Sequence, residues 1–327
     1  MKKKLCLLWA ALLLLSLAAG CGRSGGSSAA SSGSGSAGGS SAGSELRLET
    51  LNVELTNTGS NTAELAAALR EFPDALKTAL AKSEVVVDSV RVTVGTSTSA
   101  TCAALSGSGV DVAFLPTEDF TRYGEGLSGI LGNGKGTPGG RVQICAASTE
   151  RGKALAAAVK DGKTLAWDEL NKANWGVVKA RAAGNEGDSV PLAAAVSLWL
   201  SDRYEGNTVS DLGHAATYGS YDELARAVED GKVDAFPLPV EQLPELASVL
   251  ANSPVLWTSE ALFTWAAAVK SDSADLLDRR FSAALADAVE TLCKEDPERA
   301  KAFGAAHFLA VNDGELDATR RLWTLNG

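Results

Sequence analysis

Two stretches of the chain, about 124 residues apart, repeat one order of structural signals. Each has an apolar strand, a glycine, a loop rich in hydroxyl side chains, a helix and a second apolar strand that ends in proline. The closing strands are Gly109–Pro116 and Gly231–Pro239, and both contain Val-Asp before the apolar run. Two such βαβ units predict an α/β protein with two related lobes and largely parallel sheets, rather than one continuous sheet.

The hydroxyl loops of the two units are candidate ligand contacts. They carry Thr96, Ser97 and Thr98 in the first unit and Ser220 in the second. The carboxyl ends of parallel strands face the ligand crevice in open sheets, and helix N-termini there suit polar or anionic groups. The same residues commonly cap helices, and capping is compatible with ligand contact, so both roles remain open.

Acidic residues open both closing strands but do not form a catalytic pair. Asp111 and Asp234 are expected to turn the chain rather than to perform acid–base chemistry, because each lies at the end of its strand away from the crevice. The glycine-rich stretch 129–136 nearly matches a phosphate-binding loop, but it ends in Gly and no helix signal follows. We interpret it as a flexible hairpin or a surface loop.

Other regular elements follow from periodicity. The segments Leu46–Leu55 and Val85–Val94 are rich in Leu and Val and predict strands. Apolar residues from Leu65 to Leu80 predict a helix that Pro73 kinks or restarts, and apolar residues from Leu277 to Leu292 predict another.

The N-terminus predicts an address outside the cytoplasm. Residues 1–20 have a basic start and an apolar run of 13 residues, which suits a secretory signal and is too short to span a bilayer. Small residues precede Cys21, as in the bacterial lipobox, so we expect Cys21 to be lipidated and the protein to be anchored on the extracytoplasmic face of the cell membrane. Plain secretion is the alternative. Residues 21–44 are mostly Ser and Gly and predict a flexible tether.

Composition excludes several functions. The formal charge of -10 lacks the basic footprint of a nucleic-acid-binding protein. Only two His, and Cys without CxxC spacing, make a zinc site unfavourable. Because no nucleophile, base and orienting group converge in the sequence, we expect neither an enzyme nor a cofactor or metal.

Several further segments carry a family resemblance. They are Gly109–Pro116 followed by Tyr123, Trp167–Leu170 before the strand Trp175–Val178, Gly219–Leu224, Val255–Ser259, and Val311–Asp313 with Asp317 and Arg320. In order and spacing the chain resembles the substrate-binding proteins of phosphate/phosphonate-type ABC transporters, which have the type II periplasmic-binding-protein fold.

The resemblance implies a two-lobed clamp that closes on a small solute and delivers it to a membrane permease. One lobe would comprise residues 45–147 and 259–327, the other residues 148–258, with two crossing segments between them. The implied ligand-binding residues are Asn57, Thr96, Ser97, Thr98, Tyr123, Asp188, Ser189, Ser220, Tyr221 and Trp265.

Departures from the family pattern bear on the ligand. Glu186 and Asp188 lie beside Ser189 in the second-lobe anion loop and would repel a phosphonate unless a cation intervened. Tyr221 replaces a common His, and Trp265 stands near a common Asn-Asp, so this aromatic pair would suit an apolar or cationic ligand face. The resemblance therefore implies a small polar solute, phosphonate-like or phosphate-like.

The remaining cysteines, Cys102, Cys145 and Cys293, would all fall in the first lobe of the family's topology. A Cys102–Cys145 disulfide is our preferred pairing outside the cytoplasm, with reduced buried thiols as the alternative. For function, the alternative to a transport protein is a membrane-tethered ligand sensor or accessory lipoprotein of the same fold.

Overall fold

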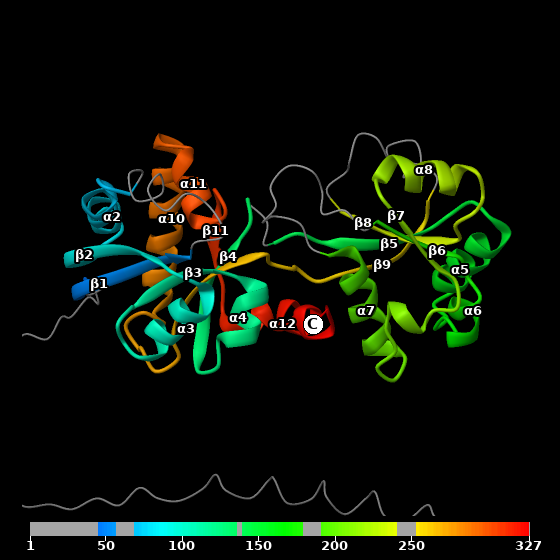
Figure 1. The fold of residues 1–327 in the computed structure, drawn as a ribbon, viewed down its shortest axis with the longest axis horizontal. Helices are drawn as coiled ribbons and strands as arrows, with labels where there is room; N and C mark the ends of the chain where they lie inside the picture. The colour runs from blue at the N-terminus through cyan, green and yellow to red at the C-terminus, as the bar shows by residue number, and fades with distance from the viewer. Residues whose placement is uncertain (1–44, 57–68, 136–138, 179–190, 241–252, 327) are drawn as a thin grey trace, which may run out of the picture. The chain divides into compact units, whose positions relative to one another are not determined.

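The computed structural model describes residues 45–56, 69–135, 139–178, 191–240 and 253–326 (Figure 1). Residues 45–327 form one compact unit. Within it, two sheets are each flanked by helices, which confirms the predicted α/β class with two sheets. The prediction of largely parallel sheets was wrong: both sheets are mixed, because strands that return from the other sheet or from the C-terminal part of the chain pair antiparallel.

The first sheet has six strands in the order β11-β4-β10-β3-β1-β2. Strand β1 pairs in parallel with β2 and β3, whereas β10 is antiparallel to both β3 and β4. Its strands are β1 (Leu46–Thr56), β2 (Val85–Gly95), β3 (Val112–Pro116), β4 (Leu127–Asn133), β10 (Trp265–Lys270) and β11 (Phe308–Ala310).

The second sheet has five strands in the order β7-β6-β8-β5-β9. Here β6 pairs in parallel with β7 and β8, and β5 is antiparallel to both β8 and β9. Its strands are β5 (Val142–Ala146), β6 (Trp175–Val178), β7 (Ala215–Tyr218), β8 (Ala235–Pro239) and β9 (Val255–Thr258). Both sheets therefore contain three neighbouring parallel strands followed by an antiparallel one.

Alternating side chains along β1 explain the layers of the first half. Leu51, Val53 and Leu55 are buried among apolar residues of α2, α10 and α11. The opposite face of the sheet packs against α3 and α4, as Figure 1 shows. The helices are α2 (Phe72–Ala81), α3 (Thr98–Ser106), α4 (Thr117–Tyr123), α10 (Arg279–Glu295) and α11 (Glu298–Phe303).

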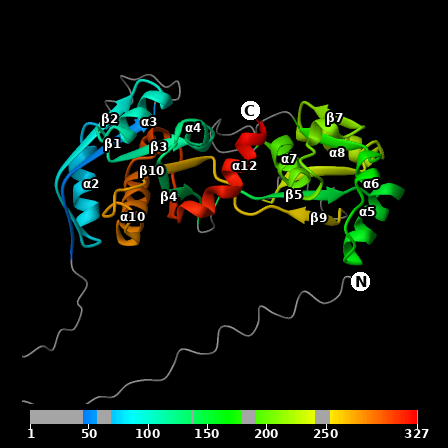
Figure 2. The same ribbon diagram turned by 90° about the horizontal axis from the view of Figure 1, so that it is seen from below.

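The second sheet is also covered by helices. Apolar side chains of α8 join one core cluster and those of α5 and α6 join another, while α7 contributes to both (Figure 2). These helices are α5 (Glu150–Lys160), α6 (Trp167–Asn171), α7 (Leu192–Arg203) and α8 (Tyr221–Glu229). The remaining short or terminal helices are η1 (Val209–Asp211), η3 (Asp313–Leu316) and α12 (Asp317–Asn326).

Local sequence signals agree with the observed boundaries in several places. Pro73 lies in the first turn of α2, where proline is tolerated, so the predicted restart falls at Phe72. The glycine-rich stretch does not follow the sequence-based interpretation of a hairpin or surface loop. Residues 129–133 belong to β4, and the four positions 129–132 are buried. That interpretation was wrong because neighbouring strands cover the glycine backbone on both sides.

Candidate functional site: two equivalent strand–helix units

The first unit presents its hydroxyl loop at the carboxyl end of β2. Ser97 is the N-cap of α3, and its Oγ accepts a hydrogen bond of 3.2 Å from the backbone N–H of Ala100. The Oγ atoms of Ser97 and Ser99 lie 3.3 Å apart. Thr96 and Ser97 are exposed and Thr98 is half-buried, so the capping role leaves the loop open to solvent.

The second unit repeats this arrangement at the carboxyl end of β7. The Oγ of Ser220 caps α8 by accepting from the backbone N–H of Glu223 at 3.2 Å. The Glu223 carboxylate in turn accepts from the backbone N–H of Gly219 at 2.8 Å. Tyr221 is the first residue of α8 and is half-buried.

The two helices also end alike. Both contain nine residues, and each is followed by a residue in left-handed backbone conformation, Ser108 (φ 62°) and Gly231 (φ 70°). From the serine caps to the closing prolines, equivalent positions differ by a constant 123 residues.

An aspartate ties the closing strand to its neighbour in each unit. Asp111 donates its N–H to the Asn52 carbonyl at 2.9 Å and accepts from the Asn52 N–H at 2.7 Å. Asp234 makes the same pair of bonds with Asn174, at 2.7 and 2.8 Å. Both carboxylates thus have a structural role, and the two units are equivalent down to this hydrogen bonding.

Two paired segments carry the chain between the sheets. The chain leaves the first sheet after β4 and returns to it before β10. The outgoing and returning segments pair at Gly140 and Leu262, which exchange two backbone hydrogen bonds of 2.8 Å. The Ser259 Oγ accepts from the Val142 N–H at 2.9 Å. Because β5 belongs to the second sheet, the change of sheet falls before Val142, earlier than the predicted boundary at residue 147.

The C-terminal helix α12 contacts both α4 and α7. The indole Nε1 of Trp323 donates to Thr117 Oγ1 at 2.9 Å, and that hydroxyl donates to the Phe263 carbonyl at 2.6 Å. Arg321 forms an ion pair with Asp202 of α7. Residues near both sheets are therefore held by the same terminal helix.

The other predicted ligand residues fall in different environments. Tyr123 is 43% exposed at the end of α4, and its hydrogen bond with Arg122 raises the pKa of that guanidinium. Trp265 is only 4% exposed and packs in the core against Gly304, so the expected exposed aromatic pair with Tyr221 is not observed. Strand β10 is central to its sheet, which explains the burial of Trp265. Asn57, Asp188 and Ser189 lie outside the described residues.

Glu54 is a candidate that sequence reasoning missed. Its Oε2 accepts a hydrogen bond of 3.1 Å from Thr93 Oγ1 on the paired strand. A Cβ placed on Gly95 would lie 2.7 Å from Glu54 Oε1, so this carboxylate adjoins the start of the Thr96–Thr98 loop. The period-two pattern of β1 could have indicated it, since Glu54 stands between two apolar residues that are buried on the opposite face of the strand.

The carboxylate of Glu54 changes the electrostatics expected of this loop. It is half-buried, and it brings a negative charge to hydroxyl groups that would otherwise suit an oxyanion. Thr101 of α3 lies beside this loop and is fully buried. Its Oγ1 has no hydrogen-bond partner among the described residues. A ligand group that donates hydrogen bonds or carries positive charge suits this end of the first unit better than a bare phosphonate does.

The predicted disulfide is wrong. Cys102, Cys145 and Cys293 are free and buried, and Cys145 lies in β5 of the second sheet rather than with the other two. Burial raises the pKa of Cys145 to about 12 and that of Cys102 and Cys293 to about 11. The alternative of reduced, buried thiols describes the structure, because each thiol occupies a core position on a different element.

The described residues contain neither a metal-ligand cluster nor a helix that could span a membrane. No group of three or more His, Cys, Asp or Glu there could hold a metal ion. Within the same part of the chain, no helix has the length and apolar character needed to cross a membrane.

Comparisons with known proteins give structural similarity only. No protein-family model and no curated protein matches the chain. A protein of Xanthomonas citri bound to ATP is 10% identical, with 85% of this chain and 96% of that chain covered and a TM-score of 0.43. A binding protein of a phosphonate ABC transporter from Pseudomonas aeruginosa is 12% identical, with 84% and 85% covered and a TM-score of 0.36.

A third solved structure, of a protein from Prochlorococcus marinus, is in complex with methylphosphonate. It is 14% identical, with 84% of this chain and 97% of that chain covered and a TM-score of 0.35. Similarities this low do not establish a family or a ligand for the chain. The two-sheet α/β architecture rests on the strand pairing described above.

Proposed function

We propose that the protein is the solute-binding lipoprotein of an ABC importer, anchored through Cys21 on the extracytoplasmic face of the cell membrane. It captures a small polar solute between two lobes and presents it to a membrane permease. The observation that carries the proposal is the equivalence of the two strand–helix units, each with a serine-capped helix at the carboxyl ends of its parallel strands. Two such units joined by two paired segments suit a clamp that closes by a hinge motion.

The chemistry of the loops defines the solute that we expect. Hydroxyl groups of Ser97 and Ser220 and the neighbouring backbone N–H groups suit polar groups, as the family resemblance to phosphonate-binding proteins implies. Glu54 adds a carboxylate beside the first loop. A solute that combines an anionic group with a donor or cationic group satisfies both features.

A thermal-shift panel on the full chain in detergent tests this function. The panel contains phosphate, alkylphosphonates, aminophosphonates, sulfonates, amino acids and cationic bases, each with and without divalent cations. A solute at 100 times its dissociation constant adds about 2.7 kcal/mol to stability, which raises the Tm by about 5 °C in a chain of this size. Silence across the panel favours the sensor or accessory role.

Affinity of the variants then tests where the solute binds. Ser97→Ala and Ser220→Ala each remove a helix cap and a ligand-facing hydroxyl, and we expect each to weaken solute binding about tenfold. Asp278→Ala removes the cap of α10, which lies outside both units, and should lower stability without changing affinity. Equal affinity in all three variants would place the solute elsewhere.

The anchor has its own test. Cys21→Ala should move the protein from the membrane fraction to the soluble extracytoplasmic fraction, because the acylated thiol is the proposed attachment. Membrane retention of this variant would contradict the lipoprotein assignment and leave the solute-binding proposal intact.

A further inference from the structure

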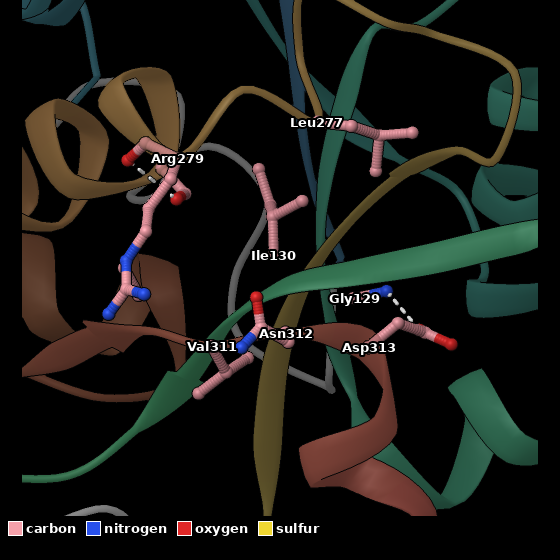
Figure 3. A pocket seen from close by; sticks show the side chains of 9 residues that line it. Gly129, Ile130, Leu277, Arg279, Val311, Asn312 and Asp313 are labelled. Carbon is pink, nitrogen blue, oxygen red and sulfur yellow. Dashed lines mark hydrogen bonds between the residues drawn. The ribbon is translucent and has the colours of Figure 1, made fainter. Parts of the chain in front are cut away.

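A cavity of about 120 Å³ lies between β4, the start of α10 and the segment that follows β11. Ile130, Ala310 and Val311 give it an aliphatic lining, and Leu277 adds an exposed apolar side chain. The polar residues of the lining are Arg279, Ser282, Asn312 and Asp313. Figure 3 shows the Arg279 side chain descending beside Ile130 toward the Val311–Asn312 segment. None of these residues belongs to the two strand–helix units.

The Arg279 guanidinium is available for a ligand. In the described part of the chain it has no hydrogen bond or ion pair, and the side chain is exposed. Its neighbour Arg280 differs: its guanidinium contacts Asp278, with Nη2 2.7 Å from Oδ2. Of these two adjacent arginines of α10, Arg280 is paired with an aspartate, whereas Arg279 has no such partner among the described residues.

Two acidic side chains near the cavity, Asp313 and Asp278, each pair with an arginine. Asp313 accepts from the Gly129 N–H at 2.7 Å and forms a 2.5 Å ion pair with Arg320. Asp278 is paired with Arg280. Arg279 is the one cation in the cavity lining, and it has no hydrogen-bond or ion-pair partner among the described residues; the Glu315 carboxylate, which accepts from the Asn312 N–H at 2.6 Å, lies outside the lining.

Asn312 supplies a second donor. Asn312 lines the cavity, and its side-chain oxygen accepts from the backbone N–H of Glu315 in a capping box, a bond that does not use its amide N–H groups. A planar guanidinium and an amide donor match the two oxygens of a carboxylate, which accepts bidentate hydrogen bonds.

We propose that this cavity binds one short aliphatic monocarboxylate. The carboxylate pairs with Arg279 and Asn312, and the alkyl group contacts Ile130, Ala310 and Val311 and covers Leu277. A cavity of about 150 Å³ accommodates benzene, so a volume of about 120 Å³ fits a molecule the size of isobutyrate. The site is separate from the solute site proposed above and does not depend on it.

Saturation-transfer-difference NMR on the full chain in non-ionic detergent tests the site, with isobutyrate as the probe at constant ionic strength. We expect saturable transfer to the methyl groups of isobutyrate and none above background for isobutyramide, which has the same shape without the charge. Arg279→Gln should weaken binding at least about tenfold, because it removes a charge-assisted pair. Arg47→Gln is the control and should change affinity less than about twofold, because Arg47 is a solvent-exposed arginine of β1 that does not line the cavity.

Equal binding of isobutyrate and isobutyramide would overturn the proposal, as would unchanged affinity in Arg279→Gln. Non-saturable transfer in the wild-type chain would do the same. Circular dichroism of both variants checks that the fold is retained. A second variant, Ala310→Leu, fills the cavity while keeping Arg279, and should also abolish binding.

Discussion

Removing the Asp234 carboxylate should be among the most destabilising single substitutions in the second sheet. The side chain is 5% exposed and accepts hydrogen bonds from Thr149 Oγ1 at 2.6 Å and from the Asn174 N–H at 2.8 Å. Hydrogen bonds to a charged group contribute about 1.5–3 kcal/mol each, so Asp234→Ala should cost about 4 kcal/mol. Two donors would lose their acceptor at once.

Thermal unfolding followed by circular dichroism measures this effect. The unfolding entropy of about 2.1 cal/mol/K per residue, over about 283 residues, converts 4 kcal/mol into a Tm lowered by about 7 °C. Asp161→Ala is the control, since its carboxylate is 58% exposed and pairs only with Lys163, and should cost under about 0.5 kcal/mol. A loss for Asp234→Ala within about 1 kcal/mol of that control would refute the reasoning.

Three further outcomes are expected. Gly304→Ala should lower the free energy of unfolding by at least about 2 kcal/mol in denaturant, because φ is 78° and the new Cβ would clash with the Trp265 indole. Gly162→Ala is the control, since its φ of 71° brings the same backbone strain but its Cβ would meet only open space. Cys145 should resist iodoacetamide at pH 8 until the chain unfolds. Because its pKa is about 12 in the folded state and near 9 unfolded, Cys145 should lower stability as pH rises above 9 by up to about 1.4 kcal/mol per unit, beside the contributions of Cys102 and Cys293, and Cys145→Ala should reduce the slope by that amount. Ser220→Ala should cost about 1 kcal/mol through loss of the α8 cap, measured by thermal unfolding.

The repeated unit was predictable because it is written locally. A serine before a helix, a glycine or its equivalent after it, and an aspartate before an apolar strand each act within a few residues. These signals gave the correct strand–helix–strand order in both halves. The caps at Ser97 and Ser220 are the residues on which the candidate site depends.

Other features depended on long-range partners. Trp265 is buried because β10 inserts between β3 and β4, two strands more than a hundred residues earlier in the chain. Glu54 became a site residue only when β2 placed Thr93 and Gly95 beside it. The residues nearest to Trp265 do not reveal its neighbouring strands, and the period-two pattern around Glu54 indicates only the face of β1 on which it lies, not the strand that pairs with it.

The sequence by itself determined the α/β class, the duplication and the helix caps, since propensity and capping act over one or two turns of chain. Tertiary structure alone decided that Cys145 lies in β5 of the second sheet whereas Cys102 lies in α3, which packs on the first sheet, and this removes the disulfide. It also left Arg279 open while Arg280 is paired. Those outcomes depend on which strands and helices, far apart in the sequence, pack against one another, and the local sequence does not encode those contacts.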